Sequence, residues 1–107
     1  MKKHTILYDN FLFEQLKDPE FCVHYLNEAA QDNDEELLLL ALNNVARAQG
    51  GFSVIAKSSK LRRNNLYRML SKSGNPTLQN FVHLLNALNF QISFRVKSKP
   101  LKLKHAA

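Results

Sequence analysis

Side chains that can recognise nucleic acid are concentrated in one short stretch, LRRNNLYRMLSK, at residues 61–72. At about 100° per residue on a helix, Leu66, Met69 and Leu70 share one face and the polar residues lie on the opposite face. Arginine can bind guanine, and asparagine adenine, through two hydrogen bonds, whereas tyrosine and lysine suit phosphate oxygens. The pattern therefore favours a helix that contacts DNA.

The same pattern could belong to an ordinary amphipathic helix with a solvated outer face. Asparagine is a poor helix former, so two adjacent asparagines are an unusual choice for a face that meets only water. We expect the N-terminal half of the helix to contact bases and the other residues to contact the DNA backbone. The expected base contacts are Arg63, Asn64, Asn65 and Arg68, and the expected backbone contacts are Lys57, Lys60, Arg62, Tyr67 and Lys72.

Acidic and basic residues are segregated along the chain. All nine acidic residues lie within the first 36 positions, together with only three lysines. The other twelve of the fifteen Lys and Arg residues lie in residues 37–107, where there is no acid. Such a basic half repels itself unless a polyanion binds to it, which favours nucleic acid, although many small proteins are basic for unrelated reasons.

The length and composition predict one compact domain without a membrane segment. A chain of 107 residues is long enough for one ordinary domain and too short for two. No stretch approaches the roughly 18 consecutive apolar residues of a membrane span, and Asp9 interrupts the apolar start too early for a signal peptide. We therefore expect a cytoplasmic protein in which the lone Cys22 is a buried structural thiol.

Apolar residues at three- and four-residue intervals predict six helices. Asn33 or Asp34 can cap the third helix, and the run Leu37 to Leu40 predicts that this helix is buried nearly all round. Asn89 suits the left-handed conformation that ends the last helix. The predicted helices span 10–16, 19–30, 34–49, 54–58 (capped by Ser53), 61–71 and 77–88 (capped by Thr77).

The sequence FQISFRVK at residues 90–97 alternates strictly between apolar and polar, which predicts a β-strand. A single strand needs a partner for its backbone donors and acceptors. Within the chain only Thr5 to Tyr8 offers one, so we favour pairing with another chain, in a two-fold dimer or on a partner's sheet. The chain then divides into an acidic helical lead-in (1–33), a DNA-binding core (34–89), and the strand with a basic tail (90–107).

Residues 51–88 have the arrangement of a helix-turn-helix unit, in which two short helices joined by a tight turn precede a longer one. The segment from residue 38 to 90 resembles HigA-like antidotes of chromosomal addiction modules, which carry a lambda-repressor-type (Xre) helix-turn-helix domain. The marks of this resemblance are LYRMLSKSGNPTL at 66–78, Ala87-Leu88, and ALNNVARAQGG at 41–51.

The resemblance implies an all-α, lambda-repressor-like helix-turn-helix bundle, to which this sequence adds a single C-terminal β-strand. Such antitoxins neutralise a small basic RelE-like or HigB-like toxin, usually an mRNA-cleaving ribonuclease, and repress the operon they share with it. We expect a homodimer on a palindromic double-stranded operator, with one reading helix per half-site. The alternative is a free-standing Xre-type repressor, of phage or mobile-element origin, without a toxin partner.

The sequence departs from the family pattern at two positions. Lys60 stands where the family usually has a glycine in the turn, and Arg62 where it usually has a serine cap. A lysine in a left-handed turn position and the loss of a serine cap each cost about 1 kcal/mol. Both changes add positive charge beside the expected DNA, so we interpret them as stability exchanged for phosphate affinity.

An enzyme is the main alternative from another class of protein. The four histidines, His4, His24, His83 and His105, are scattered, and none lies with Cys, Asp or Glu at metal-ligand spacing. We therefore expect no catalytic residue, no metal and no cofactor. The acidic first 36 residues could cover a basic toxin and mimic its RNA phosphates, or they could form a solvated helix pair that only shields the core.

Overall fold

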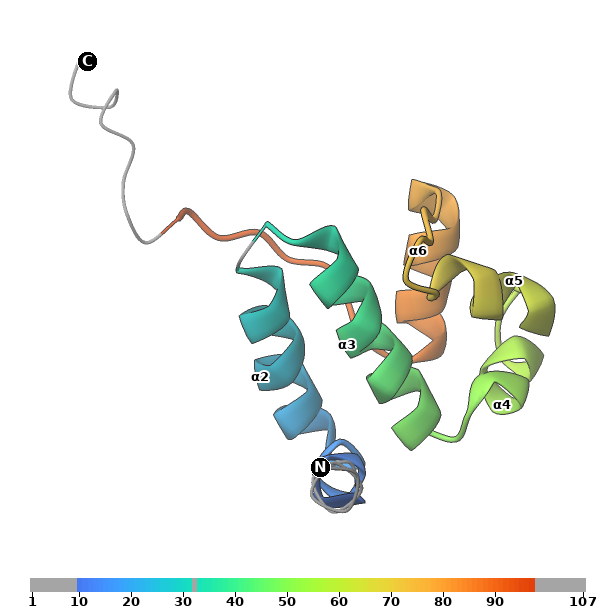
Figure 1. The fold of residues 1–107 in the computed structure, drawn as a ribbon, viewed down its shortest axis with the longest axis horizontal. Helices are drawn as coiled ribbons and strands as arrows, with labels where there is room; N and C mark the ends of the chain where they lie inside the picture. The colour runs from blue at the N-terminus through green and yellow to red at the C-terminus, as the bar shows by residue number, and fades with distance from the viewer. Residues whose placement is uncertain (1–9, 32, 98–107) are drawn as a thin grey trace.

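The computed structural model describes residues 10–31 and 33–97, and all regular secondary structure in this part of the chain is helical (Figure 1). A first helical segment covers residues 10–15. It is followed by α2 (Pro19–Ala30), α3 (Glu35–Ala48), α4 (Phe52–Lys57), α5 (Arg63–Met69) and α6 (Leu78–Ala87). The prediction of a helical protein is thus confirmed for the described residues.

The caps of three helices are set by local sequence. The Asp18 carboxylate accepts a hydrogen bond from the Glu20 backbone N–H at 3.0 Å, and proline opens α2. Asp34 caps α3 and Thr77 caps α6 in the same way, at 3.2 and 3.1 Å. Each side-chain oxygen satisfies a backbone donor that the helix itself leaves free. Asn89, with φ 66°, follows α6 in the predicted left-handed conformation.

The acidic N-terminal helices and the basic half share one hydrophobic core. Helices α2 and α3 pack side by side, and α3 also contacts α4. The Tyr25 hydroxyl accepts a hydrogen bond from Asn44 Nδ2 at 2.9 Å, and Gln49 Nε2 donates to the Leu16 carbonyl at 2.7 Å. The side chains at the centre of this core are Leu16, Cys22, Leu42, Val45, Ile55, Leu66 and Leu84.

Cys22 is a buried free thiol, as predicted. Its Sγ donates a hydrogen bond to the Leu16 carbonyl at 3.0 Å. Burial raises the pKa of the Cys22 thiol above its ordinary value, and nearby Asp18 acts in the same direction against a hydrogen bond from Gln49. The thiol therefore behaves as a packed, protonated core side chain.

The prediction that α3 is buried nearly all round is wrong. Leu39 and Leu42 are buried, but Leu37 is 36% and Leu40 55% exposed. The reason is geometric, because α2 and α4 cover only part of the circumference of α3. Four successive leucines occupy more than one face of a helix.

Helix α4 begins earlier than predicted. We expected Ser53 to cap a helix over residues 54–58, but Gly51, with φ 91°, is the N-cap and Phe52 is the first helical residue. Phe52 is only 6% exposed, and the preceding pair of left-handed glycines, Gly50 and Gly51, turns the chain so that this ring enters the core.

The turn between α4 and α5 differs from the expected geometry at Lys60. Asn33 and Asn89 are the non-glycine residues with positive φ in the described part of the chain, so Lys60 does not take the left-handed conformation. The Ser59 hydroxyl instead accepts a hydrogen bond from the Leu61 N–H at 3.1 Å. The strain that we expected at Lys60 is therefore absent.

The predicted β-strand over residues 90–97 is also wrong for the described chain, which has no strand there. The Phe90 N–H bonds to the Leu85 carbonyl at 2.8 Å, but no backbone hydrogen bond joins residues 91–97 to another described segment. The alternating pattern is present, but a strand requires a neighbour for its backbone groups. The other candidate strand, Thr5 to Tyr8, lies outside the described residues.

None of the helices within residues 10–31 and 33–97 is both long enough and apolar enough to cross a bilayer.

Candidate nucleic-acid interface

Helices α4 and α5 and the turn between them bring most of the predicted contact residues together at one end of the molecule (Figure 1). Lys57 ends α4, Lys60 lies in the turn, and Arg62 is the N-cap of α5. All three side chains are exposed. No side chain caps α5, which agrees with the interpretation of Arg62 as a replaced cap residue.

Helix α5 has the two faces that its sequence predicts. Leu66 is fully buried, and Met69 and Leu70 are 5% and 2% exposed, so the apolar face anchors the helix in the core. The outward residues are Arg63, Asn64, Tyr67 and Arg68, which are exposed, and Asn65, which is half-buried. The five polar side chains thus form one accessible face.

Arg63 is held over α5 by an aromatic stack. The Tyr67 ring makes an edge-to-face contact with Phe52 of α4, with 4.6 Å between ring centroids. The Arg63 guanidinium lies 5.6 Å from the Tyr67 ring centroid and donates to the Tyr67 hydroxyl at 3.4 Å. This cation–π contact limits the rotamers of Arg63, so buried Phe52 positions an exposed cation through Tyr67.

Arg68 and Asn65 form a second ordered pair one turn further along α5. Arg68 donates a hydrogen bond from its guanidinium to Asn65 Oδ1 at 2.5 Å. The Asn65 amide nitrogen and the other guanidinium donors of Arg68 have no such partner within the described chain and remain available. Two hydrogen-bonding side chains are thus fixed side by side at the surface.

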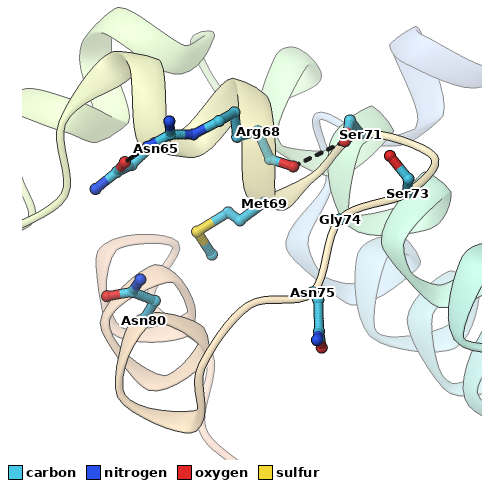
Figure 2. A pocket seen from close by; sticks show the side chains of 8 residues that line it. All are labelled: Asn65, Arg68, Met69, Ser71, Ser73, Gly74, Asn75 and Asn80. Atoms are coloured by element: carbon cyan, nitrogen blue, oxygen red, sulfur yellow. Dashed lines mark hydrogen bonds between the residues drawn. The ribbon is translucent and has the colours of Figure 1, made fainter.

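The polar surface continues beyond α5 into a hollow of about 340 Å³ between α5 and the first turn of α6 (Figure 2). Three of its residues, Ser73, Asn75 and Asn80, were not identified from the sequence. Figure 2 shows Asn80 on α6 facing the hollow from the side opposite Asn65 and Arg68. The available signal was weak: residues 71–80 are mostly polar and contain no acid.

Lys72 is the predicted residue that the structure separates from the others. It follows α5 and borders a different hollow, of about 510 Å³, together with Asp34, Glu36 and Arg47 of the α3 region. Asn43 Nδ2 of α3 donates to the Leu70 carbonyl at 3.1 Å and fixes this loop against α3. Lys72 therefore lies at the margin of the surface formed by α4 and α5.

No carboxylate in the described part of the chain forms an ion pair with the cations of this surface. The one ion pair within the described ranges joins Lys17 to Glu14 at 3.0 Å, far away in sequence. Residues 37–107 contain no acid, so the basic side chains keep their full charge for an anionic ligand. Among the described residues, no three His, Cys, Asp or Glu side chains are grouped to hold a metal ion.

One of the comparisons with known proteins names a family. The model of the family described as "Probable addiction module antidote protein" matches residues 8–96. A protein of Haemophilus influenzae, described only as an uncharacterized protein, is 40% identical over 87 residues, which cover 73% of this chain and 89% of the relative. No solved structure gives a significant match.

Proposed function

This chain belongs to the probable addiction module antidote family, and we propose that it is the DNA-binding antitoxin of a type II toxin–antitoxin pair. It binds operator DNA through α4 and α5 and represses its own operon. It also neutralises a small basic toxin of the RelE or HigB type. Membership in an antidote family implies a toxin partner and a non-enzymatic role.

The observation that supports DNA binding best is the uncompensated polar face of α5. Its apolar side is fixed in the core by Leu66 and Met69, and its outer side presents arginine and asparagine that form no ion pair with a carboxylate of the described residues. A solvated amphipathic helix would not need aromatic support for an exposed arginine, whereas Phe52 and Tyr67 give Arg63 that support.

We assign base readout to the ordered side chains of this face. Arg63 and Arg68 can each bind guanine bidentately, and Asn64 and Asn65 can bind adenine. Because Asn65 already accepts a hydrogen bond from Arg68, its amide nitrogen is directed to an acceptor on the DNA. These contacts need α5 to lie in the major groove, as in helix-turn-helix proteins.

The remaining basic residues are assigned to the phosphate backbone. Lys57, Lys60 and Arg62 follow one another along the end of α4, the turn and the cap of α5. Tyr67 can contact a phosphate through its hydroxyl, and Lys72 can do so only at the margin of the interface. Such contacts fix the protein on the duplex but do not read its sequence.

We assign toxin binding to the acidic N-terminal part of the chain, because its charge is opposite to that of a basic toxin. All nine acidic residues precede position 37, and Glu28, Asp34, Glu35 and Glu36 are exposed on α2 and at the start of α3. Opposite charges accelerate and orient protein association. A free-standing repressor without a toxin partner is the alternative function, and it would leave this acidic surface without a ligand.

Two binding assays test the proposal in its two parts. The chain should bind DNA from upstream of its own gene with a log–log salt slope of about −3 to −4 per protomer, since four cations contact phosphates. Unrelated DNA is the control. If the chain shows no preference for its own upstream DNA at physiological salt, it is not an autorepressor.

The toxin part is tested by co-expression with the small protein encoded beside this gene. An antitoxin should restore growth and copurify with that protein. If the neighbouring product is harmless, or if growth is not restored, the free-standing repressor is the better description.

A further inference from the structure

Residues 91–97 have the pattern of a strand and lie exposed on the surface. Ile92 is 43%, Phe94 93% and Val96 85% exposed, and the residues between them are polar. Figure 1 shows the segment as an extended run that leaves the end of α6 and passes α2 and α3. Three apolar side chains at alternate positions of an extended chain form one apolar edge.

Within the described chain, the backbone of residues 91–97 makes no hydrogen bond, although residues 93–97 border a hollow beside the end of α2. The residue just before the segment, Phe90, still bonds to the fold, since its N–H donates a hydrogen bond to the Leu85 carbonyl at 2.8 Å. Beyond Phe90, no hydrogen bond joins residues 91–97 to any other part of the chain that the structure describes. Free donors and acceptors along an extended apolar segment are a template for another strand.

We propose that residues 91–97 pair antiparallel with the same residues of a second copy of this chain, around a two-fold axis at Phe94. In this register Ile92 faces Val96 and Phe94 faces Phe94 of the other copy, so all apolar side chains meet on one face. On the opposite face the pairs are Gln91 with Lys97 and Ser93 with Arg95. No two like charges are directly opposite, and this favours the register because opposed like charges destabilise a strand pair.

The neighbouring registers are worse for physical reasons. An axis at Arg95 would place two arginines opposite each other, and a shift by one residue would mix apolar and polar side chains on both faces. An axis at Ser93 would extend the ladder to Asn89, whose φ of 66° is not a strand conformation. It would also use Phe90, which packs against the core.

A second copy suits this segment better than the edge of a basic partner. Arg95 and Lys97 make the segment cationic, so a basic toxin would be repelled, whereas self-pairing sets each cation against a neutral Gln or Ser. This inference goes beyond the proposed function and does not depend on DNA or toxin binding. It predicts a homodimer with one α5 on each side of the two-fold axis.

The register is tested by a cysteine scan in the full chain. Phe94→Cys places two thiols opposite each other in a strand pair, where a disulfide can form, so mild oxidation should give a covalent dimer. Ser93→Cys is the matched control, since its thiol faces Arg95 and should cross-link far less. The native Cys22 is buried, and oxidation of the wild-type protein measures how much covalent dimer this cysteine alone produces.

Sedimentation equilibrium provides a second readout that does not depend on disulfide geometry. The wild-type chain should be a dimer, and Phe94→Lys should raise the dimer dissociation constant about tenfold or more, because it removes an aromatic pair and sets two cations opposite each other. Because Phe94 is 93% exposed, circular dichroism should show an unchanged fold.

Three results would overturn the inference. One is a wild-type chain that stays monomeric at all concentrations, as pairing with residues 5–8 of the same chain or with a toxin would give. Another is a dimer that Phe94→Lys does not weaken. The third is equal cross-linking of the Ser93→Cys and Phe94→Cys variants, which would exclude the two-fold axis at Phe94.

Discussion

Of the three glycines, Gly74 is the one where an added side chain would meet the closest atoms. A Cβ atom at Gly74 would lie 2.2 Å from the Met69 carbonyl oxygen and 2.8 Å from the Arg68 carbonyl oxygen. Carbon–oxygen contacts normally stay beyond about 3.3 Å, so the loop and the end of α5 would have to separate by about 1 Å. Both obstacles are backbone atoms, which no side-chain rotamer change can relieve.

We expect Gly74→Ala to lower the free energy of unfolding by about 2 to 3 kcal/mol, the upper part of the range for overpacked sites. For a domain of this size, that corresponds to a melting temperature lower by roughly 10 to 20 °C. Urea and thermal unfolding, followed by far-ultraviolet circular dichroism, measure both quantities. The hollow between α5 and α6 in Figure 2 would be distorted as well.

Two matched variants separate the clash from other effects of adding a methyl group. Ser73→Ala alters the exposed neighbour of Gly74 and should change stability by less than about 0.5 kcal/mol. Gly51→Ala meets no atom within 4 Å, but Gly51 has φ 91° and ψ 167°, so the change should cost about 1 to 3 kcal/mol through backbone strain alone. A Gly74→Ala variant as stable as Ser73→Ala would refute the reasoning.

Three further predictions concern the turn and the core. Arg62→Ser should restore a cap to α5, raising the free energy of unfolding by about 1 kcal/mol while weakening operator binding; a melt and a DNA titration check the two effects. Lys60→Gly should not stabilise the protein, because Lys60 does not have a positive φ. If urea unfolding showed a free energy of unfolding higher by about 1 kcal/mol, Lys60 would have to be in the left-handed conformation after all. Burial raises the pKa of the Cys22 thiol in the folded chain. As the pH rises above the ordinary thiol pKa, the thiol therefore ionises in the unfolded chain before it ionises in the folded chain. The folded state should therefore lose stability in this alkaline range relative to its value at neutral pH, and Cys22→Ala should show less of this loss in pH-dependent unfolding.

Features that depend on a few neighbouring residues were predictable from the sequence. Asp34 and Thr77 cap helices through contacts three residues away, so a local rule is sufficient. The two faces of α5 followed from helical spacing, and the structure buries Leu66, Met69 and Leu70 as that spacing requires.

Features that depend on distant contacts were not predictable. Ser53 fits a cap rule, but Phe52 is buried as the first residue of α4, and the N-cap is Gly51. Asn80 belongs to another helix and reaches the polar hollow only through the tertiary fold. The alternation in residues 90–97 predicted a strand, but a strand also needs a neighbour for its backbone groups, and the described chain supplies none. The division into segments 1–33, 34–89 and 90–107, and the DNA contacts themselves, remain predictions.

The central claim is that α5 reads operator DNA, and the Arg63→Ala/Arg68→Ala variant tests it most directly. Binding to DNA from upstream of the gene, measured by fluorescence anisotropy, should weaken about a hundredfold or more, because each arginine that contacts a base contributes about 1 to 3 kcal/mol. The charge-matched control, Lys17→Ala/Arg47→Ala, should bind almost as wild type does, and both variants should still bind the toxin. If the Arg63→Ala/Arg68→Ala variant bound this DNA with wild-type affinity, the account would be contradicted.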